Sequence, residues 1–295
     1  MSARAALAPH GYVGAGIIIL AEALLFTGDR VVGQWFTPIV WTGYVLLADA
    51  FVYRLRGHSP LVSDRTAFLI MALISILAWW MFEFYNAPRF WRSDRELWWH
   101  YHNLEPNPFL RRVGYDWAFA TIFPALFLTA EVLLATVFRH RPRMRPVALS
   151  RTALRLMSVI GAAMALLPLV VISEWFAPLV WLAFIFLVDP INALRDWPSI
   201  CGDLMRGDWR RLTALLVSGF VCGILWEFWN YWAISRWTYT VPYLGHIKIF
   251  EMPVLGYFGF PPFAVECWAI YIFCRSLLAP PSRMADDTVW MPTRD

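Results

Sequence analysis

Two short stretches of the sequence combine an acid, an amide and several aromatic rings in apolar surroundings. The stretch WEFWN covers residues 226–230, and the stretch MFEFYN covers residues 81–86. On a helix, a spacing of i to i+3 puts Glu227 and Asn230 on one face, and the same holds for Glu83 and Asn86. An ionisable group at membrane depth costs at least a few kcal/mol, so its repeated occurrence indicates a function.

Glu227 and Glu266 are the acids with the least polar neighbourhood. Neither has a cationic residue within one helical turn in the sequence, and aromatic residues surround both. Desolvation disfavours the charged carboxylate, so we expect these groups to keep their protons and to act as proton donors. The faces of neighbouring rings can stabilise a cation. The rings in question are Trp226, Trp229, Trp232, Trp237, Tyr239, Tyr257, Phe258 and Phe260.

A proton donor in an aromatic cage is what the cyclisation or isomerisation of a polyene requires. The acid protonates a double bond or an epoxide, the rings stabilise the carbocation, and a base removes a proton at the end. The candidate catalytic residues are Glu227, Glu266, Glu83 and Glu251. The candidate substrate-binding residues are Asn230, Asn86, Trp226, Trp237, Tyr239, His246 and Phe260.

Cofactor and metal motifs are not found in the sequence. No nucleotide-binding loop, haem pair or flavin fingerprint occurs, so we expect a reaction without a cofactor. His100 in WWHYHN, with His246 as a partner, supplies too few ligands for a metal site, and we predict none. The four cysteines have no ligand spacing and are interpreted as small apolar residues.

The composition predicts that membrane helices position these residues. The 295 residues are 59% hydrophobic and 16% charged, and their mean hydropathy is +0.52. Runs long enough to cross about 30 Å of hydrocarbon predict an all-α integral membrane protein with eight spans. The predicted spans are 12–28, 38–54, 66–86, 115–138, 156–173, 177–194, 212–234 and 254–275.

Arginines in the loops predict the orientation of the chain. Most of them fall on one side of the eight spans, which places both termini in the cytoplasm of a bacterial inner membrane. Glu22 interrupts the first apolar run, so we interpret this run as a retained span and not as a signal peptide. The pI near 9.0 is explained by arginines beside anionic lipid, without a nucleic-acid partner.

The sequence contains an internal duplication. WFTPIVW from Trp35 reappears as WFAPLVW from Trp175, at an offset that also relates Asp49 to Asp189. A slightly larger offset relates Glu83 to Glu227. Four spans in each copy mean that the second copy enters the membrane in the same orientation, which predicts two parallel repeats. The predicted domains are a first repeat at 1–138, a basic linker at 139–155, a second repeat at 156–279 and a polar tail at 280–295.

Further pairs extend the duplication. They match Trp91 with Trp237, His100 with His246, Glu105 with Glu251, and Glu131 with Glu266. For Asp49 and Asp189, at the ends of their helices, we expect structural ion pairs with neighbouring arginines such as Arg54 and Arg195.

The second copy resembles the repeated domain of heterodimeric carotenoid (lycopene) cyclases. The resemblance covers roughly 50 residues and consists of an acidic helix, a Trp-x-Tyr loop, a glycine-bearing segment and a proline that opens an aromatic helix. Here these features are Glu227, Trp237 with Tyr239, Gly245, and Pro261 or Pro262 with Glu266. The family has adjacent carboxylates shortly after the proline, whereas this chain has Glu266 alone. The resemblance implies a redox-neutral membrane enzyme that acts on an isoprenoid.

Two other functions are compatible with the same residues. Pseudo-symmetric halves with intramembrane carboxylates also occur in carriers, so the chain is a candidate carrier or binding protein for a lipid, a cation or protons. Alternatively, the acids form buried structural pairs in a scaffold subunit, and the tryptophans form interfacial belts. The expected partner is a membrane lipid or isoprenoid, and homo-oligomerisation is left open.

Overall fold

The computed structural model describes residues 6–87, 97–171, 173–240, 244–278, 284 and 287–293. In this part of the chain, eight helices are long and apolar enough to cross a membrane, which confirms the predicted all-α membrane fold. The first repeat contributes α1 (Pro9–Phe26), α3 (Phe36–Arg56), α5 (Arg65–Asn86), and α6 (Pro108–Ala120) continued by α7 (Ile122–Ala135). The second repeat contributes α8 (Arg151–Val170), α9 (Ala177–Leu194), α11 (Arg210–Trp232), and η3 (Val254–Gly259) continued by α12 (Phe260–Leu278).

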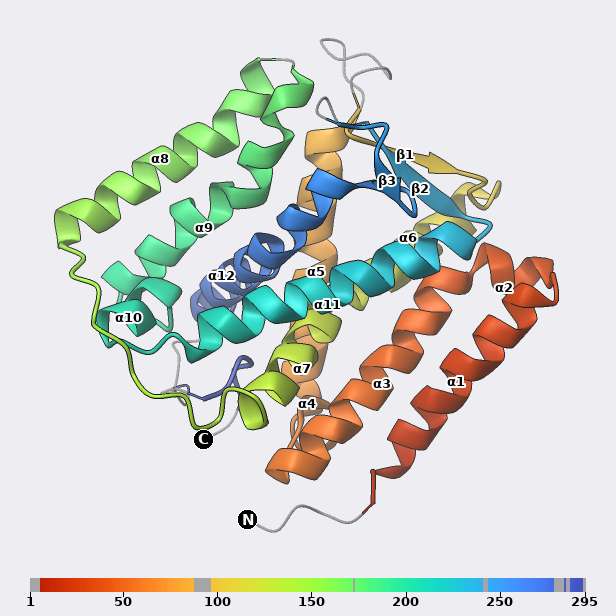
Figure 1. The fold of residues 1–295 in the computed structure, drawn as a ribbon, viewed down its shortest axis with the longest axis horizontal. Coiled ribbons are helices and arrows are strands. Elements are labelled where there is room, and N and C mark those ends of the chain that lie inside the picture. Colours follow the sequence, from red (N-terminus) through yellow and green to blue (C-terminus); the bar gives the residue numbers. More distant parts are fainter. Residues whose placement is uncertain are drawn as a thin grey trace.

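Short elements connect the spans at both ends of the bundle. They are α2 (Arg30–Gln34), α4 (Pro60–Ser63), η2 (Glu174–Phe176), α10 (Ile200–Met205), and the strands β1 (Trp99–His102), β2 (Arg236–Tyr239), β3 (Lys248–Ile249) and β4 (Met252–Pro253). We call the end of the bundle with β1 and β2 the strand side (Figure 1). The opposite end, which carries the connection from α7 to α8, is called the linker side.

Polar side chains set the first residues of several spans. The carboxylate of Asp64 accepts a hydrogen bond from the Ala67 N–H at 3.0 Å and so caps α5. Ser150 caps α8 by accepting a hydrogen bond from the Ala153 N–H at 3.1 Å. Such caps satisfy backbone donors that have no partner within the helix. Because α8 already begins at Arg151, the linker ends earlier than the predicted residue 155.

Four helices form the centre of the bundle, and two helix pairs flank it. Helices α5, α7, α11 and α12 pack against one another, with α1–α3 on one flank and α8–α9 on the other (Figure 1). Glycines bring the flanking helices into close contact, as in many membrane helix pairs. A Cβ atom on Gly14 would lie 2.5 Å from the carbonyl oxygen of Gly43, and one on Gly161 would lie 2.2 Å from the Leu187 nitrogen.

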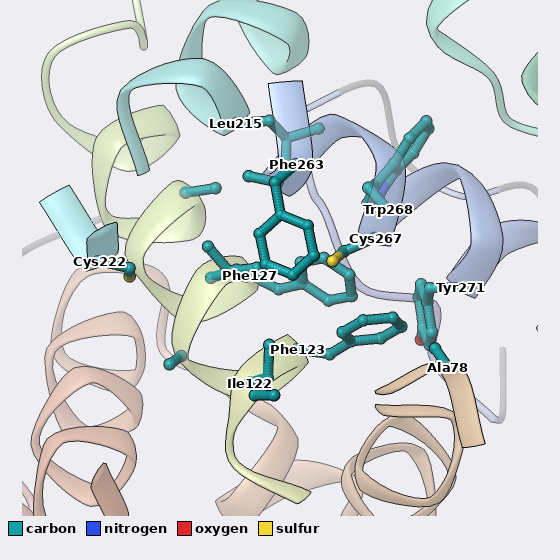
Figure 2. Packing of buried hydrophobic residues seen from close by; sticks show 14 of the residues in the cluster. Ala78, Ile122, Phe123, Phe127, Leu215, Cys222, Phe263, Cys267, Trp268 and Tyr271 are labelled. Atoms are coloured by element: carbon teal, nitrogen blue, oxygen red, sulfur yellow. The ribbon is translucent and has the colours of Figure 1, made fainter. Parts of the chain in front are cut away.

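Aromatic residues fill the space between the central helices. Figure 2 shows Phe123 and Phe127 of α7 together with Phe263, Trp268 and Tyr271 of α12. The ring of Phe127 packs against that of Phe123 at 5.3 Å and against that of Tyr271 at 5.2 Å. This contact joins the last span of the first repeat to the last span of the second repeat.

Asp49 and Asp189 bind backbone and hydroxyl groups on the linker side. Asp49 accepts hydrogen bonds from the Ser59 hydroxyl at 2.7 Å and from the Leu61 N–H at 3.1 Å, and His10 lies 3.0 Å away. Asp189 accepts hydrogen bonds from the N–H groups of Ile200 and Cys201, both at 2.8 Å.

The predicted pairing of these two acids with Arg54 and Arg195 is therefore wrong. Asp49 of α3 and Asp189 of α9 lie beside the first turns of α4 and α10. The backbone N–H groups of a first turn have no partner within their own helix, and here they take the place of a guanidinium partner. The equivalent positions of Asp49 and Asp189 support the parallel duplication.

The segment Asp287–Thr293 packs back into the linker side of the bundle. Glu131 forms an ion pair with Arg56 at 2.7 Å and accepts hydrogen bonds from the Thr288 hydroxyl at 2.6 Å and from the Val289 N–H. The Trp268 indole donates to the Val289 carbonyl at 2.8 Å. Residues 288–291 are all buried, so this part of the predicted polar tail belongs to the core. Glu131 thus differs from Glu266, although the sequence repeat pairs them.

Candidate functional site

A two-stranded antiparallel ribbon joins the two repeats on the strand side. The Cα partners are Trp99 with Tyr239, His100 with Thr238, Tyr101 with Trp237, and His102 with Arg236. The segment WHY of β1 therefore faces WTY of β2 in reverse order. Exchanging the two strands leaves this pairing unchanged, which is the arrangement that a two-fold axis through the His100–Thr238 pair produces.

The two faces of the ribbon carry different residues because side chains alternate along a strand. Trp99, Tyr101, Trp237 and Tyr239 all line a cavity in the bundle. The other positions carry His100, which contacts the Thr240 hydroxyl at 3.0 Å, and His102, which contacts the Thr238 hydroxyl at 2.8 Å. Each of these histidines therefore has a cross-strand threonine as its partner.

The two asparagines of the repeated motifs anchor the ribbon to the bundle. The side chain of Asn230 accepts a hydrogen bond from the Trp237 N–H at 2.9 Å and donates to the Trp237 carbonyl at 2.8 Å. Asn86 accepts hydrogen bonds from the N–H groups of Trp98 and Trp99 at 2.8 and 3.3 Å, and donates to the Trp99 carbonyl at 2.8 Å. The asparagines thus satisfy main-chain groups that the partner strand does not use.

The sequence predicts that Asn86 and Asn230 bind the substrate. In the structure, both side chains instead position the ribbon. Both amide groups are occupied by backbone partners, and neither asparagine is among the residues that line the cavity.

Each repeat contains a glutamate that is hydrogen-bonded to a tyrosine of the ribbon. Tyr239 donates to Glu227 at 2.7 Å, and Tyr101 donates to Glu83 at 2.5 Å. Glu227 is fully buried, and its second carboxyl oxygen has no hydrogen-bond partner within the described residues. The Trp237 indole N–H donates to the Tyr239 oxygen at 2.6 Å. We call the contacts Tyr239–Glu227 and Tyr101–Glu83 the two Glu–Tyr pairs.

The environments of the two Glu–Tyr pairs differ. Besides Tyr101, the carboxylate oxygen of Glu83 accepts hydrogen bonds from the indoles of Trp79 and Trp99, at 3.0 and 3.3 Å. Within the described residues Glu83 thus has three hydrogen-bond donors, whereas Glu227 has the Tyr239 hydroxyl as its donor. Burial, followed by the adjacent glutamate, raises the pKa of both Tyr101 and Tyr239 well above the ordinary value of a phenol. Both tyrosines therefore stay neutral hydroxyl groups at physiological pH.

The cavity below the ribbon has a volume of about 540 Å³ and lies between the repeats. This volume is within the range of small-molecule binding sites. Each repeat contributes eight aromatic residues to its wall: Trp35, Trp41, Trp79, Trp98, Trp99, Tyr101, Tyr115 and Phe119 from the first, and Trp175, Trp181, Trp226, Trp237, Tyr239, Phe258, Phe260 and Phe263 from the second. Charged groups in the wall are Glu105, Arg111 and Arg236. The cavity suits a mainly apolar ligand.

Four of the predicted substrate-binding residues line this cavity, namely Trp226, Trp237, Tyr239 and Phe260. Glu227 and Glu83 reach it through the hydroxyl groups of Tyr239 and Tyr101. The predicted acids are thus placed behind tyrosines and not directly in the wall.

Three other predicted site residues lie away from the cavity lining. Glu266 is fully buried on α12, where it accepts a hydrogen bond from the Phe184 N–H at 2.9 Å. Glu251 lies in a loop and is 3.6 Å from Arg236 in an ion pair. His246 is exposed in the turn before β3. None of Glu266, Glu251 and His246 is in the cavity wall or hydrogen-bonded to a Glu–Tyr pair within the described residues, so the structure does not bring them together with the rest of the predicted site.

The sequence reasoning missed Tyr101 and Trp99. The alignment of repeats gave the place of Trp237 to Trp91, which lies outside the described residues. The contacts give this place to Trp99, and the place of Tyr239 to Tyr101, because these residues have the matching partners Asn86 and Glu83. The spacing Trp-x-Tyr occurs in both copies, as WHY in the first and WTY in the second, and this shared pattern could have identified Trp99 and Tyr101 from the sequence.

Metal ligands do not gather at this site. Within the described residues, no group of three or more histidine, cysteine, aspartate or glutamate side chains is arranged to hold a metal ion.

The fold and the cavity define an all-α integral membrane protein of two parallel repeats with an aromatic chamber between them. Comparisons with protein-family models, with curated proteins and with solved structures find no match for this chain.

Proposed function

We propose that the protein is a cofactor-free intramembrane enzyme that cyclises or isomerises an isoprenoid or polyene lipid through a carbocation. The observation that supports this proposal most directly is the aromatic cavity of about 540 Å³ with a Glu–Tyr pair from each repeat at its wall. The proposal includes a functional likeness to the heterodimeric lycopene cyclases that the second repeat resembles.

Glu227 and Tyr239 are the proposed acid. The Tyr239 hydroxyl, which donates to Glu227 at 2.7 Å in the structure, turns towards the substrate and delivers its proton to a carbon–carbon double bond, while the protonated carboxyl group gives its own proton to the phenol oxygen. The π electrons of that bond form the new C–H bond and leave a cation on the neighbouring carbon. A second double bond of the same molecule then attacks the cation and closes a ring, or the cation loses a proton directly.

Glu83 and Tyr101 are the proposed base. The released proton passes to the Tyr101 hydroxyl as that group gives its own proton to Glu83, whose charged form has three hydrogen-bond donors. One proton enters the substrate and one leaves it, so the product is an isomer of the substrate, and no oxidant or reductant is consumed. The enzyme returns to its starting state when Glu83 releases its proton to water and Glu227 takes one up.

The cavity wall stabilises the cationic intermediate. Indole and phenyl faces attract a cation with roughly 0.5–2 kcal/mol each, and more where water is excluded. Trp41 and Trp226 approach each other to 5.0 Å between ring centroids, and Trp181 stacks on Phe82 at 5.1 Å. Rings of both repeats therefore surround the same space.

The membrane orientation forms part of the proposal. Arginines are concentrated on the linker side, so we place this side and both termini in the cytoplasm of a bacterial inner membrane. The cavity and the ribbon then lie towards the outer leaflet.

Product analysis in cells that supply linear isoprenoids tests the proposal. Cells that express the wild-type chain are expected to accumulate an isomer with altered retention and absorption, and Glu227→Gln and Tyr239→Phe are expected to abolish it. The matched control is Glu22→Gln, since Glu22 is another membrane glutamate that accepts an indole hydrogen bond, from Trp229 at 2.9 Å, but lies outside the cavity lining.

Three results would contradict the assignment. Unchanged isoprenoid profiles in a competent host would exclude the enzyme. Accumulation of an unmodified lipid, lost in Glu227→Gln, would favour the carrier. Loss of product in Glu266→Gln but not in Glu227→Gln would move the acid to α12.

A further inference from the structure

Two hydrogen-bond donors in the cavity wall have no role in the proposed proton transfer. Thr37 and Trp41 both line the cavity, and their i to i+4 spacing puts them on one face of α3. The Thr37 hydroxyl and the Trp41 indole N–H are buried, and neither has a hydrogen-bond partner within the described residues. Trp41 is only 1% exposed. Buried polar groups in proteins are nearly always paired, so two adjacent exceptions in a cavity wall call for an acceptor that the protein itself does not supply.

The missing partner of Thr37 has a structural reason. A threonine in a membrane helix usually donates to the carbonyl one turn earlier, as Thr42 does to the Pro38 carbonyl at 2.7 Å. For Thr37 that carbonyl belongs to Gly33, which accepts a hydrogen bond from the Ile234 N–H at 3.0 Å. Thr37 is the second residue of α3, so α3 holds no carbonyl one turn before it, and Gly33 belongs to α2.

The second repeat lacks the hydroxyl at the corresponding place. The offset that relates Trp41 to Trp181 relates Thr37 to Ala177, and all four residues line the cavity. An apolar wall that only had to hold a hydrocarbon would be served by alanine in both copies. The Thr37 hydroxyl is thus a difference between two repeats whose cavity walls otherwise correspond at these positions.

We propose that Thr37 and Trp41 bind an oxygen atom of the ligand, so that the substrate of this cavity is an oxygenated isoprenoid with a hydroxyl, carbonyl or epoxide group. This inference rests on the proposed function, because it concerns the substrate of the same cavity. Neither donor is charged, and their neighbours Trp35 and Pro38 in the wall are apolar, which suits a neutral oxygen better than an anionic one.

The contacts of Trp41 locate the oxygen relative to the acid. Its ring packs at 5.0 Å against those of both Trp226 and Trp229, which flank Glu227 on α11. The oxygenated part of the ligand therefore binds in the half of the cavity that carries Glu227 and Tyr239.

Binding measurements with two probes test this inference without requiring any reaction. The full chain is purified in detergent micelles, and tryptophan fluorescence is titrated with geranylgeraniol or with the hydrocarbon in which hydrogen replaces its hydroxyl group. The wild-type chain is expected to bind the alcohol about tenfold more tightly than the hydrocarbon. Thr37→Val is expected to weaken binding of the alcohol about five- to tenfold, the effect of one lost hydrogen bond, and to leave binding of the hydrocarbon unchanged.

Two further variants serve as controls. Thr37→Ser keeps the hydroxyl and is expected to keep the preference for the alcohol. Thr37→Ala copies the residue that the fold accepts at position 177, and it replaces Thr37→Val should the latter not fold. Because all variants are measured in the same micelles, partitioning of a given probe into detergent cancels between variants. For the comparison of the two probes, their concentrations are expressed as mole fractions within the micelle.

Equal binding of the two probes by the wild-type chain would overturn the inference, as would an equal loss for both probes in Thr37→Val. The outcome is separable from that of the proposed function. A chain that prefers the alcohol but forms no product supports the oxygen site and refutes the enzyme, whereas conversion of a pure hydrocarbon with no preference for oxygen does the reverse.

Discussion

Replacement of Asn230 by alanine is expected to destabilise the protein by releasing β2 from the bundle. The substitution leaves the N–H and the carbonyl of Trp237 without their partners at 2.9 and 2.8 Å. Each backbone group that loses its partner in a buried site costs about 1–3 kcal/mol. Since Trp237 also borders the cavity, water relieves part of this cost, and we expect a loss of about 2–4 kcal/mol in unfolding free energy.

Thermal unfolding of the purified chain in detergent measures this loss. At roughly 2 °C per kcal/mol for a chain of this size, the midpoint is expected to fall by about 4–8 °C. Asn86→Ala provides the matched variant in the other repeat. It is expected to cause at least as large a decrease, because Asn86 holds three main-chain groups. An unchanged midpoint in both variants would refute the assignment of the asparagines as anchors of the ribbon.

Three further predictions concern other parts of the fold. Arg56→Met leaves the buried Glu131 unpaired and is expected to cost about 3–5 kcal/mol, which chemical denaturation would detect; the double variant with Glu131→Leu should recover most of the loss. Asp203 of α10 is buried and forms an ion pair with Arg211. Burial, opposed by Arg211, raises the pKa of Asp203 to about 6 from 3.8. Protonation of this carboxyl group therefore adds about 3 kcal/mol to the free energy of unfolding, an effect that is fully present below pH 4 and is lost as the pH rises to 6. Unfolding midpoints of wild type and Asp203→Asn across this window test the sign, and the opposite slope would mean that the ion pair outweighs burial. Gly161→Leu should abolish the close contact of α8 with α9 and lower the yield of folded protein, whereas Gly16→Leu, where a Cβ atom meets nothing within 4 Å, should not.

The eight spans were predictable because each requires only a long apolar run, which hydropathy detects without tertiary information. The duplication was predictable where Trp35 and Trp175 open identical patterns. The partners of Asp49 and Asp189 were not predictable. Backbone donors at the starts of α4 and α10 leave no residue-type signal, whereas the nearby arginines do.

The candidate site was only partly predictable from sequence. Glu83 and Glu227 are recognisable as acids in apolar runs, but Tyr101 lies in β1, within a connection between spans whose length hid its equivalence to Tyr239. The burial of Val289 and Trp290 was missed because a four-residue apolar stretch between charged residues resembles an ordinary tail. Both features depend on contacts between residues that are far apart in the chain, and periodicity does not report such contacts.

The register of the ribbon has a consequence for the origin of the molecule. Because His100 and Thr238 lie on the axis that exchanges the strands, a single four-span unit could form the same ribbon with an identical copy of itself. The ancestor of this chain would then have been a homodimer whose chamber had two equal halves. Joining two such units in one chain would allow each half to change separately, and the difference between Thr37 and Ala177 is of the kind that this would produce.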